Sequence, residues 1–383
     1  TNVTNKRTIA CMTATRADYP RVRSVLEEIN RRPNLDLKLI VTGMHLLPEF
    51  GNTVDEILED GFEIYKRIEI YDQDDTPYGM AKTAARCSLG IADALDEIKP
   101  DLFLITVDRI ETLAAAQSVA YMNIPMAHIQ GGEVTGTIDE SIRHAVTKLS
   151  HIHFPATEEA AERIVKMGEL PEFVFPVGCP YIDIIKNLDV LSKNDLSEKY
   201  GFDANKKLVI FTQHPVTTEY GSGSNHLDKT IEALEMCDDL EIISIYSNAD
   251  AGGREIIKKM NQNPNFHVFP NIPDTDFLSL MNVANLMIGN SSAGIREAPS
   301  FRLPVVNIGS RQNGRFREAN VIDVDHSVNE IKNAIDRALS QNFAQSISEI
   351  KNPYGDGGSA SRIVDILEKI DLNENLINKK IAY

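Results

Sequence analysis

The chain has 383 residues, with 39 Lys and Arg against 56 Asp and Glu, so its formal net charge is −17. With 42% hydrophobic residues it has the composition of a globular protein, and its length predicts two or three domains rather than a disordered chain. The acidic balance disfavours nucleic acid or an anionic membrane as a partner. An anionic ligand would have to be held by a local cluster of donors.

The four cysteines lie far apart and form no C-x-x-C pair, which predicts reduced thiols and a cytoplasmic protein. No apolar run approaches the roughly 18–20 residues of a membrane span, and the first residues lack the layout of a signal peptide. Neither H-E-x-x-H nor an aspartate-rich motif occurs. We therefore predict a protein without membrane association, metal or other cofactor.

Short apolar runs alternate with helix-periodic segments along the first half of the chain. The predicted strands are 7–15, 35–43, 63–70 (an edge strand), 102–107, 125–130, 151–156 and 173–178. The predicted helices are 19–32, 53–59, 78–97, 111–122, a helix from 139, and 157–167. Such alternation predicts a parallel sheet covered by helices on both faces.

The alternation stops at the polar segment 187–206, which we predict to be a linker between domains. Beyond it the predicted strands are 207–212, 241–247, 266–270, 286–290 and 304–309, and the predicted helices are 226–237, 253–262, 274–283, 292–298, 327–341 and 358–371. We expect an α/β protein with two doubly wound domains, 1–186 and 207–357. Ligands of such sheets bind beyond the carboxyl ends of the strands, so two facing domains would place the site in the cleft between them.

Small and hydroxyl-bearing residues follow one predicted strand of the second domain, in the segment Gly-Asn-Ser-Ser-Ala-Gly-Ile-Arg-Glu at 289–297. The hydroxyls of Ser291 and Ser292, with the free N–H groups of a helical first turn, suit a diphosphate. The alternative is that either serine is only a helix N-cap. Glu297, one turn further on, can accept hydrogen bonds from a ribose.

Cationic and imidazole side chains follow other predicted strands. Arg16 comes after the first strand, and Arg311 and Arg315 share one loop of the second domain. Each arginine is either a hydrogen-bond donor to a bound anion or a solvated surface cation. For the loop of Arg311 and Arg315, the negative net charge of the chain favours anion binding. His214 closes the first strand of the second domain and is equally suited to a functional or a structural role.

Carboxylates and an imidazole gather after the strands of the first domain. Asp108 ends an apolar strand, Glu133 follows the next strand, Asp139 begins a helix, and His45 lies beyond the second strand. Groups that converge at adjacent strand ends can supply a general acid and a general base. The alternative for each is a structural role, and Asp139 is well placed to cap its helix.

Together these segments resemble the family of hydrolysing UDP-N-acetylglucosamine 2-epimerases, which includes bacterial enzymes of sialic-acid biosynthesis and the epimerase half of a human bifunctional epimerase/kinase. The resemblance covers nearly the whole chain. The matching segments, in order, are TRADY at 15–19, GMHLLPEFGNT at 43–53, DR at 108–109, MNIP at 122–125, GGEVTGTIDESIRHAVTKLSH at 131–151, QHPVTT at 213–218, IGNSSAGIRE at 288–297 and RQNGR at 311–315.

The resemblance implies a GT-B-like fold of two Rossmann-like domains, in which a C-terminal helix at about 358–383 crosses back onto the first. It implies homodimers or homotetramers that bind UDP and a UDP-sugar. The implied nucleotide contacts are Arg16, Arg109, His214, Asn248, Ser291, Ser292, Glu297 and Arg311. Asp108, His45 and Asp139 are the implied active-site residues of the first domain.

The implied reaction eliminates UDP across C1–C2 to give a 2-acetamidoglucal, then adds water with inversion at C2 to give N-acetylmannosamine. The C2 proton is weakly acidic because no carbonyl is adjacent to that carbon. The bond from C1 to UDP must therefore break ahead of the transfer of the C2 proton. Hydrogen-bond donors that contact the diphosphate and carboxylates near the developing cation help this step.

Two positions on the sugar side depart from the family pattern. Gln130 stands where relatives often carry a Glu proposed as acid/base, and Val107 stands where they usually carry Gly. An amide cannot titrate, so Gln130 can position the substrate but cannot transfer the proton. That transfer must fall on Asp108, Glu133, Asp139 or a histidine. These departures leave the identity of the sugar undecided. The alternative substrate is a UDP-2,4-diacetamido-2,4,6-trideoxyhexose of the legionaminic-acid branch. Two further functions fit the same fold, a GT-B glycosyltransferase and a non-catalytic nucleotide-sugar sensor.

Overall fold

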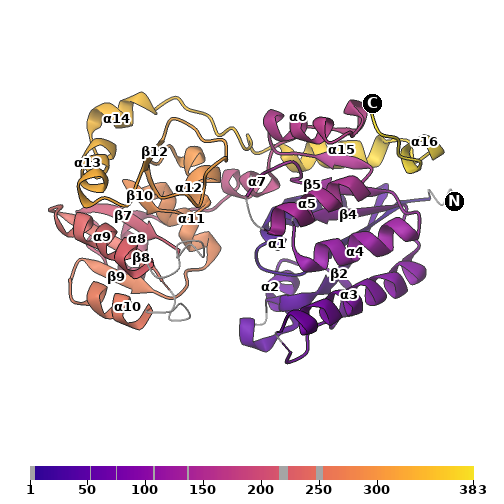
Figure 1. The fold of residues 1–383 in the computed structure, drawn as a ribbon, viewed down its shortest axis with the longest axis horizontal. Coiled ribbons are helices and arrows are strands. Elements are labelled where there is room, and N and C mark those ends of the chain that lie inside the picture. Colours follow the sequence, from indigo (N-terminus) through magenta and orange to yellow (C-terminus); the bar gives the residue numbers. More distant parts are fainter. Residues whose placement is uncertain are drawn as a thin grey trace. The chain divides into compact units, whose positions relative to one another are not determined.

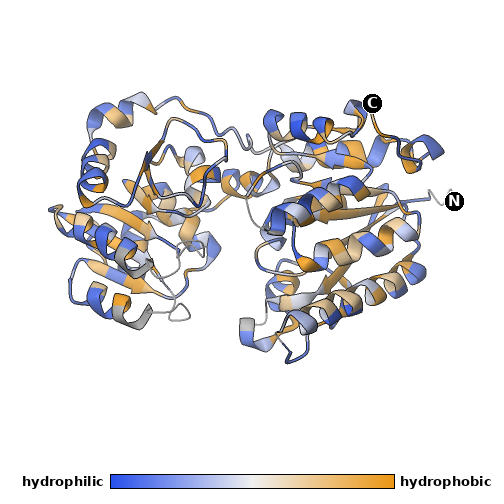
Figure 2. Cartoon of the chain, viewed as in Figure 1, coloured by the Kyte–Doolittle hydropathy of each residue, from blue (hydrophilic) through white to orange (hydrophobic). Residues whose placement is uncertain are grey.

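A computed structural model describes residues 5–51, 53–74, 76–106, 108–135, 138–214, 223–246 and 253–383. The chain folds into two compact units, Thr1–Lys186 with Tyr354–Tyr383, and Asn187–Pro353 (Figure 1). In each unit the hydrophobic residues concentrate on the strands and on the helix faces that cover them (Figure 2). Burial of these apolar faces is the main favourable contribution to folding.

The first unit is built on a parallel sheet of order β3-β2-β1-β4-β5-β6. Its strands are β1 (Arg7–Thr13), β2 (Leu35–Thr42), β3 (Ile64–Ile68), β4 (Leu102–Thr106), β5 (Met126–Ile129) and β6 (Ile152–Phe154). Its helices are α1 (Tyr19–Arg31), α2 (Val54–Glu59), α3 (Pro77–Ile98), α4 (Ile110–Tyr121), α5 (Ile138–Leu149), α6 (Glu158–Lys166), α7 (Pro180–Lys186), α15 (Ser359–Lys369) and α16 (Glu374–Ile377). Separate buried clusters, one with α1 and α15 and the other with α3 and α4, cover the two sheet faces.

The second unit repeats this plan with the order β12-β11-β10-β7-β8-β9. Its strands are β7 (Lys207–Thr212), β8 (Leu240–Ile245), β9 (Phe266–Phe269), β10 (Leu286–Gly289), β11 (Val305–Ile308) and β12 (Val321–Val324). Its helices are α8 (Lys193–Tyr200), α9 (Gly223–Glu235), α10 (Gly253–Asn261), α11 (Asp274–Val283), α12 (Ala293–Arg296), α13 (Val328–Ala338) and α14 (Gln341–Ser346).

Both sheets have the strand order 3-2-1-4-5-6 of a Rossmann fold, counted from each unit's own first strand. The chain leaves the first and fourth strands in opposite directions, which opens a crevice at their carboxyl ends. In the first unit this switch point lies between β1 and β4, and in the second between β7 and β10. Arg16, Asp108 and Arg109 follow the strands at the first switch point, and His214, Ser291 and Ser292 follow those at the second, whereas His45, Gln130, Glu133 and Arg311 follow neighbouring strands.

Segment 187–206 is not the linker that we predicted. It contains α8 and belongs to the second unit, where Leu196 is buried and the Tyr200 hydroxyl donates to Asp276 of α11. Only one narrow face of α8 is apolar, so its helical periodicity is weak in a charged sequence. Residues 354–357 likewise belong to the first unit, where Cys179 N donates to Tyr354 O over 2.6 Å.

Segment 173–178 is not a strand, contrary to expectation. It begins in a 3-10 turn, Pro171–Phe173, and then runs beside β6 with a single bridge between His153 and Val174. Phe175 N and Val177 N donate to the His153 and Pro155 carbonyls, but Pro155 has no N–H to donate in return, so the ladder does not continue beyond this bridge. The edge strand β12 escaped prediction because it is short and only partly buried.

The C-terminal residues that follow α15 pack against the end of α5, the helix that carries Asp139. Glu169 lies at the centre of this contact, almost fully buried. Its carboxylate accepts hydrogen bonds from His153 Nε2 at 2.8 Å, Lys148 Nζ at 2.5 Å and Lys379 Nζ at 2.5 Å. Lys379 also donates to the Lys148 carbonyl at 2.6 Å, at the carboxyl end of α5. A cation at this position also interacts favourably with the helix dipole.

Replacing Glu169 with Gln is expected to lower the free energy of unfolding by about 2 kcal/mol at pH 7. Burial raises the pKa of the Glu169 carboxyl, but the hydrogen bonds from His153, Lys148 and Lys379 outweigh burial and lower it to about 2. A carboxyl group whose pKa is lower in the folded state stabilises the fold at pH values above its pKa in the unfolded chain. This stabilisation is lost as the pH falls toward the folded-state pKa. Denaturation curves should therefore show the deficit of the variant shrinking between about pH 4.5 and pH 2. A deficit independent of pH would contradict this ion cluster.

Candidate active site

The first switch point is filled by a carboxylate of the chain itself. Asp18, buried after β1, accepts hydrogen bonds from Ala14 N at 3.0 Å and Thr15 N at 3.1 Å, and from the Thr13 hydroxyl. Burial raises the pKa of Asp18 to about 7, while the hydrogen bonds from Thr13 and Ala14 oppose the rise. The Asp18 carboxyl group already occupies these N–H donors, so they do not offer a diphosphate the cradle that a glycine-rich Rossmann loop provides.

His45 belongs to the same buried network. Its Nε2 lies 2.9 Å from Thr13 Oγ1, and its Nδ1 lies 2.7 Å from Thr53 Oγ1. Thr13 donates its proton to Asp18, so Nε2 is the donor toward Thr13 and Nδ1 accepts from Thr53. Burial, followed by the Arg16 charge, lowers the pKa of His45 to about 4, which makes the ring neutral at pH 7. His45 therefore orders the loop after β1 from inside the core.

Glu111 on α4 is a fully buried carboxylate that the sequence analysis did not single out. Its Oε1 accepts a hydrogen bond from the Tyr71 hydroxyl at 2.5 Å, and its Oε2 lies 3.6 Å from Arg109 Nε. A buried carboxylate is costly unless it is paired. Glu111 is therefore paired with the charge of Arg109, a residue that follows β4 at the switch point and keeps part of its side chain exposed.

Asp108 and Glu133 are joined by Arg143, a buried α5 residue that the sequence analysis also missed. The guanidinium forms an ion pair with Asp108 and donates to the Glu133 carbonyl over 2.6 Å. Gln130 Nε2 approaches Glu133 Oε2 at 3.4 Å. The ends of β4 and β5 and the face of α5 thus converge on one cluster. Arg143 lies one turn after Asp139, a helical spacing that could have revealed it.

Asp139 lies in the first turn of α5, beside this cluster. Partial burial, followed by the Asp108 charge, raises its pKa, while Arg109 and Arg143 act in the opposite direction. A raised pKa favours the protonated form of Asp139, which suits a general acid.

In the second unit, Asn290 joins the ends of β7 and β10. Its Oδ1 accepts from His214 N, and its Nδ2 donates to the His214 carbonyl, each over 2.7 Å. Gly289 precedes it at φ +133°, where a Cβ would lie 1.8 Å from the Thr212 carbonyl oxygen. Only glycine allows the two strand ends to approach this closely. The His214 side chain is exposed at this switch point.

Gly289→Ala is expected to lower the free energy of unfolding by about 3 kcal/mol or more, because the new methyl group overlaps the Thr212 backbone. Gly201→Ala is the matched control, since Gly201 also has a positive φ, +80°, but no atom within 4 Å of its Cβ position. The control should lose only about 1 kcal/mol. Thermal unfolding of the two variants distinguishes them, and equal losses would contradict the close approach at Gly289.

Donors gather beside this close approach. The N–H groups of Ser291 and Ser292 donate no hydrogen bond within the described part of the chain, and Arg311 forms no ion pair there. Arg311 Nη1 donates to the Asn290 carbonyl at 3.1 Å, and Gln312 Nε2 donates to the same oxygen at 2.9 Å. Desolvation by the surrounding groups lowers the pKa of Arg311, but a guanidinium remains charged at neutral pH. This is a cationic, amide-rich cluster suited to an anion.

The other predicted residues have varied surroundings. The helix that we predicted at 292–298 is only the four-residue α12 followed by a 3-10 turn, so its dipole contributes little. Glu297, at the end of α12, is partly buried. Arg16 lies 3.5 Å from Glu56 in an exposed ion pair. Asn248 lies outside the described residues.

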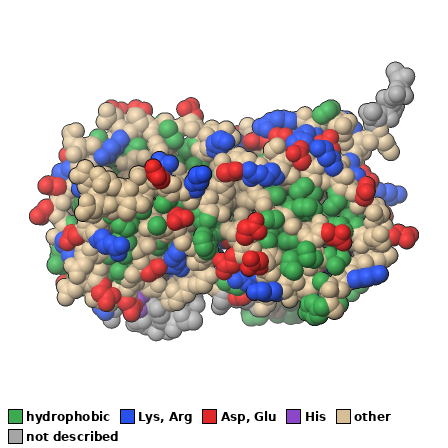
Figure 3. Space-filling model, turned by 90° about the horizontal axis from the view of Figure 1, so that it is seen from above, with side chains coloured by type: hydrophobic (Ala, Val, Ile, Leu, Met, Phe, Trp, Pro, Cys, Tyr) green, Lys and Arg blue, Asp and Glu red, His purple; other side chains and the backbone are tan. Residues whose placement is uncertain are grey.

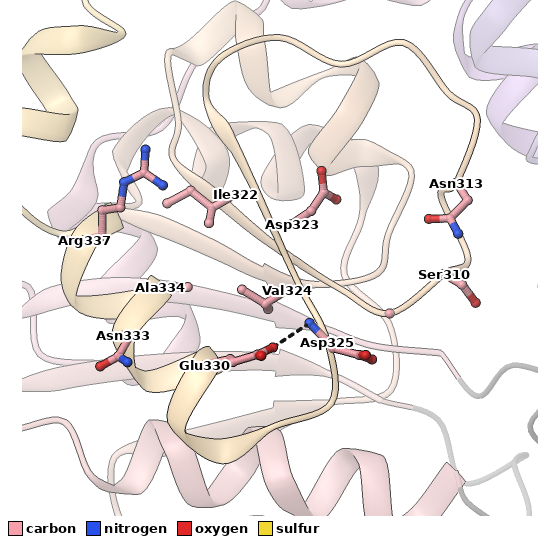
Figure 4. A pocket seen from close by; sticks show the side chains of 11 residues that line it. Ser310, Asn313, Ile322, Asp323, Val324, Asp325, Glu330, Asn333, Ala334 and Arg337 are labelled. Atoms are coloured by element: carbon pink, nitrogen blue, oxygen red, sulfur yellow. Dashed lines mark hydrogen bonds between the residues drawn. The ribbon is translucent and has the colours of Figure 1, made fainter.

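A pocket of about 710 Å³ opens between β12 and α13 in the second unit (Figure 4). Asp323, Asp325 and Glu330 line it, and Arg337 is its cation. Three carboxylates disfavour a diphosphate, so this pocket does not replace the Arg311 cluster as the anion site. On the face in Figure 3, basic side chains lie among acidic ones rather than in one broad patch.

Two features are absent from the described residues. These residues contain no group of three or more His, Cys, Asp or Glu side chains placed to hold a metal ion. None of their helices has both the length and the apolar character that a membrane crossing requires.

The two Rossmann-type units define the class of the protein as a GT-B-like α/β fold. A solved structure of this kind, UDP-GlcNAc 2-epimerase from Neisseria meningitidis bound to UDP-GlcNAc, matches with a TM-score of 0.82 at 19% identity. It covers 95% of this chain and 100% of that one. The S. aureus MnaA–UDP structure matches with a TM-score of 0.79 at 22% identity, covering 94% and 96%.

Sequence comparison identifies the family. The family model described as UDP-N-acetylglucosamine 2-epimerase matches residues 27–368. A UDP-N,N′-diacetylbacillosamine 2-epimerase (hydrolyzing) from Legionella pneumophila is 39% identical over 98% of this chain and 100% of its own. A UDP-N-acetylglucosamine 2-epimerase from Neisseria meningitidis is 37% identical over 87% of each chain. The chain belongs to the UDP-N-acetylglucosamine 2-epimerase family.

Proposed function

We propose that the protein is a hydrolysing 2-epimerase, which converts a UDP-linked 2-acetamido-2-deoxyhexose and water to UDP and the free sugar epimeric at C2. The observation that carries this proposal is the opposite chemistry of the two switch points. Carboxylates gather around Asp108 in the first unit, whereas unpaired N–H groups gather around Arg311 in the second. Membership of the epimerase family supports the same assignment.

UDP binds, in this proposal, to the second unit. Ser291, Ser292 and Arg311 hold the diphosphate, because N–H donors and a guanidinium match its oxygens. Glu297 accepts from the ribose, and the exposed His214 reaches the nucleotide. Arg109, held by Glu111, contributes a further cation from the first unit, as does Arg16.

The reaction proceeds in two steps. The C1–O bond to UDP breaks with its electron pair leaving on the diphosphate, a carboxylate takes the C2 proton, and a C1–C2 double bond forms. Water then adds its hydroxyl to C1 while a proton reaches C2 from the opposite face. Asp108, Glu133 and Asp139 are the proposed groups for these transfers, since Gln130 cannot titrate and His45 is occupied within the core.

The favoured substrate is UDP-N,N′-diacetylbacillosamine, a UDP-2,4-diacetamido-2,4,6-trideoxyhexose. The Legionella relative of this name matches over its whole length, and a Campylobacter jejuni GDP/UDP-N,N′-diacetylbacillosamine 2-epimerase (hydrolyzing) is 37% identical over 89% of this chain. UDP-N-acetylglucosamine is the second candidate, supported by the Neisseria relative. The products would feed legionaminic-acid or sialic-acid biosynthesis, respectively.

The test is incubation with each UDP-sugar in H₂¹⁸O or D₂O, without an acceptor, followed by mass spectrometry. Equimolar UDP and free 2-epimeric sugar, with solvent oxygen at C1 and deuterium at C2, are expected. The favoured substrate should show the higher kcat/KM. Transfer only in the presence of an added acceptor would identify a glycosyltransferase, and tight UDP binding without any product would identify a sensor. Either result would overturn the proposal.

The proposed function includes an oligomeric state and a cellular compartment. We infer a homodimer or homotetramer in the cytoplasm, as implied by the family resemblance and by the reduced cysteines. Light scattering coupled to size-exclusion chromatography measures the first property, and fractionation of cells that express the native gene measures the second. A monomer at catalytic concentrations, or recovery outside the cytoplasm, would contradict these assignments.

A further inference from the structure

Gln130 is held in an unusual position at the end of β5. Its backbone has φ +61°, a left-handed conformation that is uncommon for a residue with a side chain. Its N–H donates to the Phe154 carbonyl at 2.9 Å, which fixes this conformation against β6. Only 1% of the residue is exposed, so its side chain is covered by other protein atoms.

The Gln130 amide faces the carboxylate of Glu133. Its Nε2 lies 3.4 Å from Glu133 Oε2, whereas Oε1 has no hydrogen-bond partner within the described residues. A reversed amide would set two oxygen atoms against each other, so the donor end must face the carboxylate. The side chain thus leaves its own acceptor unsatisfied in order to present a donor to Glu133.

We propose that Gln130 is a positioning residue. It holds the Glu133 carboxyl group in one orientation, avoids the proton sharing that a second carboxyl group would cause, and does not itself contact the sugar. This inference rests on the proposed 2-epimerase function. A carboxyl group at position 130 would lie against Glu133, and two neighbouring carboxylates share a proton because both cannot ionise freely. The amide removes this competition and leaves Glu133 able to change its charge on its own.

Charged groups surround the pair. Arg143 donates to the backbone carbonyl of Glu133 and also pairs with Asp108, so one guanidinium holds the Glu133 backbone beside the Asp108 carboxylate. Arg163 of α6 donates to the Gly132 carbonyl at 2.6 Å. Among the described residues, the titratable and charged groups near the pair include Asp108, Asp139, Arg109 and Arg143, Arg163 with its partner Glu159, and His128.

The test compares Gln130→Glu with Gln130→Met through the pH profile of kcat/KM. In Gln130→Glu the acid limb should move upward by about one pH unit or more, because the shared proton must be removed before Glu133 is ionised. Activity should recover toward the wild-type value at higher pH. Gln130→Met has nearly the same length but no donor and no charge. It should lower kcat without moving the acid limb or raising KM.

Two outcomes would overturn the proposal. An unmoved acid limb in Gln130→Glu would show that no titrating carboxyl depends on position 130. A large rise in KM with unchanged kcat in Gln130→Met would show that Gln130 binds the sugar directly. UDP affinity, measured by calorimetry, should stay at the wild-type value in both variants because the nucleotide cluster lies in the other unit.

A stability measurement tests the pairing even if the wild-type chain turns over neither UDP-sugar, which is the result that defeats the proposed function. The raised pKa of the new carboxyl pair in Gln130→Glu means that the folded state binds its proton more tightly than the unfolded chain does. Stability is then lost as pH rises. The deficit in Tm relative to wild type should be larger at pH 8 than at pH 5. Equal deficits would refute the contact between residues 130 and 133.

Discussion

Asp108→Asn is expected to lower kcat by about 10²–10⁴-fold, the range of a general acid or base, while UDP affinity stays close to that of the wild type. Asn has the same shape but no charge, so it cannot take a proton, and its ion pair with Arg143 becomes an ordinary hydrogen bond. The proposed diphosphate donors of the second unit, Ser291, Ser292 and Arg311, are unchanged. Steady-state UDP release measures kcat, and calorimetry measures UDP affinity.

The matched control for this prediction is Asp93→Asn. Asp93 is an exposed carboxylate on α3 in the same unit, and it should keep full activity. Loss of activity in both variants would point to a general effect of the net charge. Near-normal activity of Asp108→Asn would remove Asp108 from the mechanism, and the acid and base would then be Glu133 and Asp139.

Arg311→Ala is expected to weaken UDP binding by about 10–100-fold, the value of one charge-assisted hydrogen bond to a phosphate. The Arg311 side chain is accessible to a ligand, forms no ion pair within the described part of the chain and is held by the Asn290 carbonyl. A cation that is already oriented loses little freedom when an anion arrives. The affinity of the wild type should therefore fall with added salt more steeply than that of the variant.

Arg337→Ala is the control for Arg311→Ala. Arg337 is an exposed cation of the same unit that lines the acidic pocket, so its removal should leave UDP affinity unchanged. Calorimetric titration with UDP at two salt concentrations measures both variants. Equal affinity of Arg311→Ala and wild type would place the diphosphate elsewhere, and a loss confined to Arg337→Ala would move the site to that pocket.

Most of the architecture could be predicted from the sequence, because burial leaves a periodic trace. The run LFLIT of β4 is buried on both faces and reads as a parallel strand, and the alternating β3 lies at a sheet edge as expected. Elements with weak burial escaped prediction. The edge strand β12 is half-buried and α8 has a narrow apolar face, so neither stands out from a charged background.

Local periodicity and contiguous motifs were enough to predict two α/β units, the family, and the chemical character of each group of site residues. Which of those residues meet depends on the folded chain. Arg143 pairs with Asp108 across 35 positions of sequence, Glu111 pairs with Arg109, and Asp18 occupies the N–H groups of the loop after β1. Such pairings depend on strand order and helix rotation, which bring distant side chains together and leave no periodic trace in the sequence.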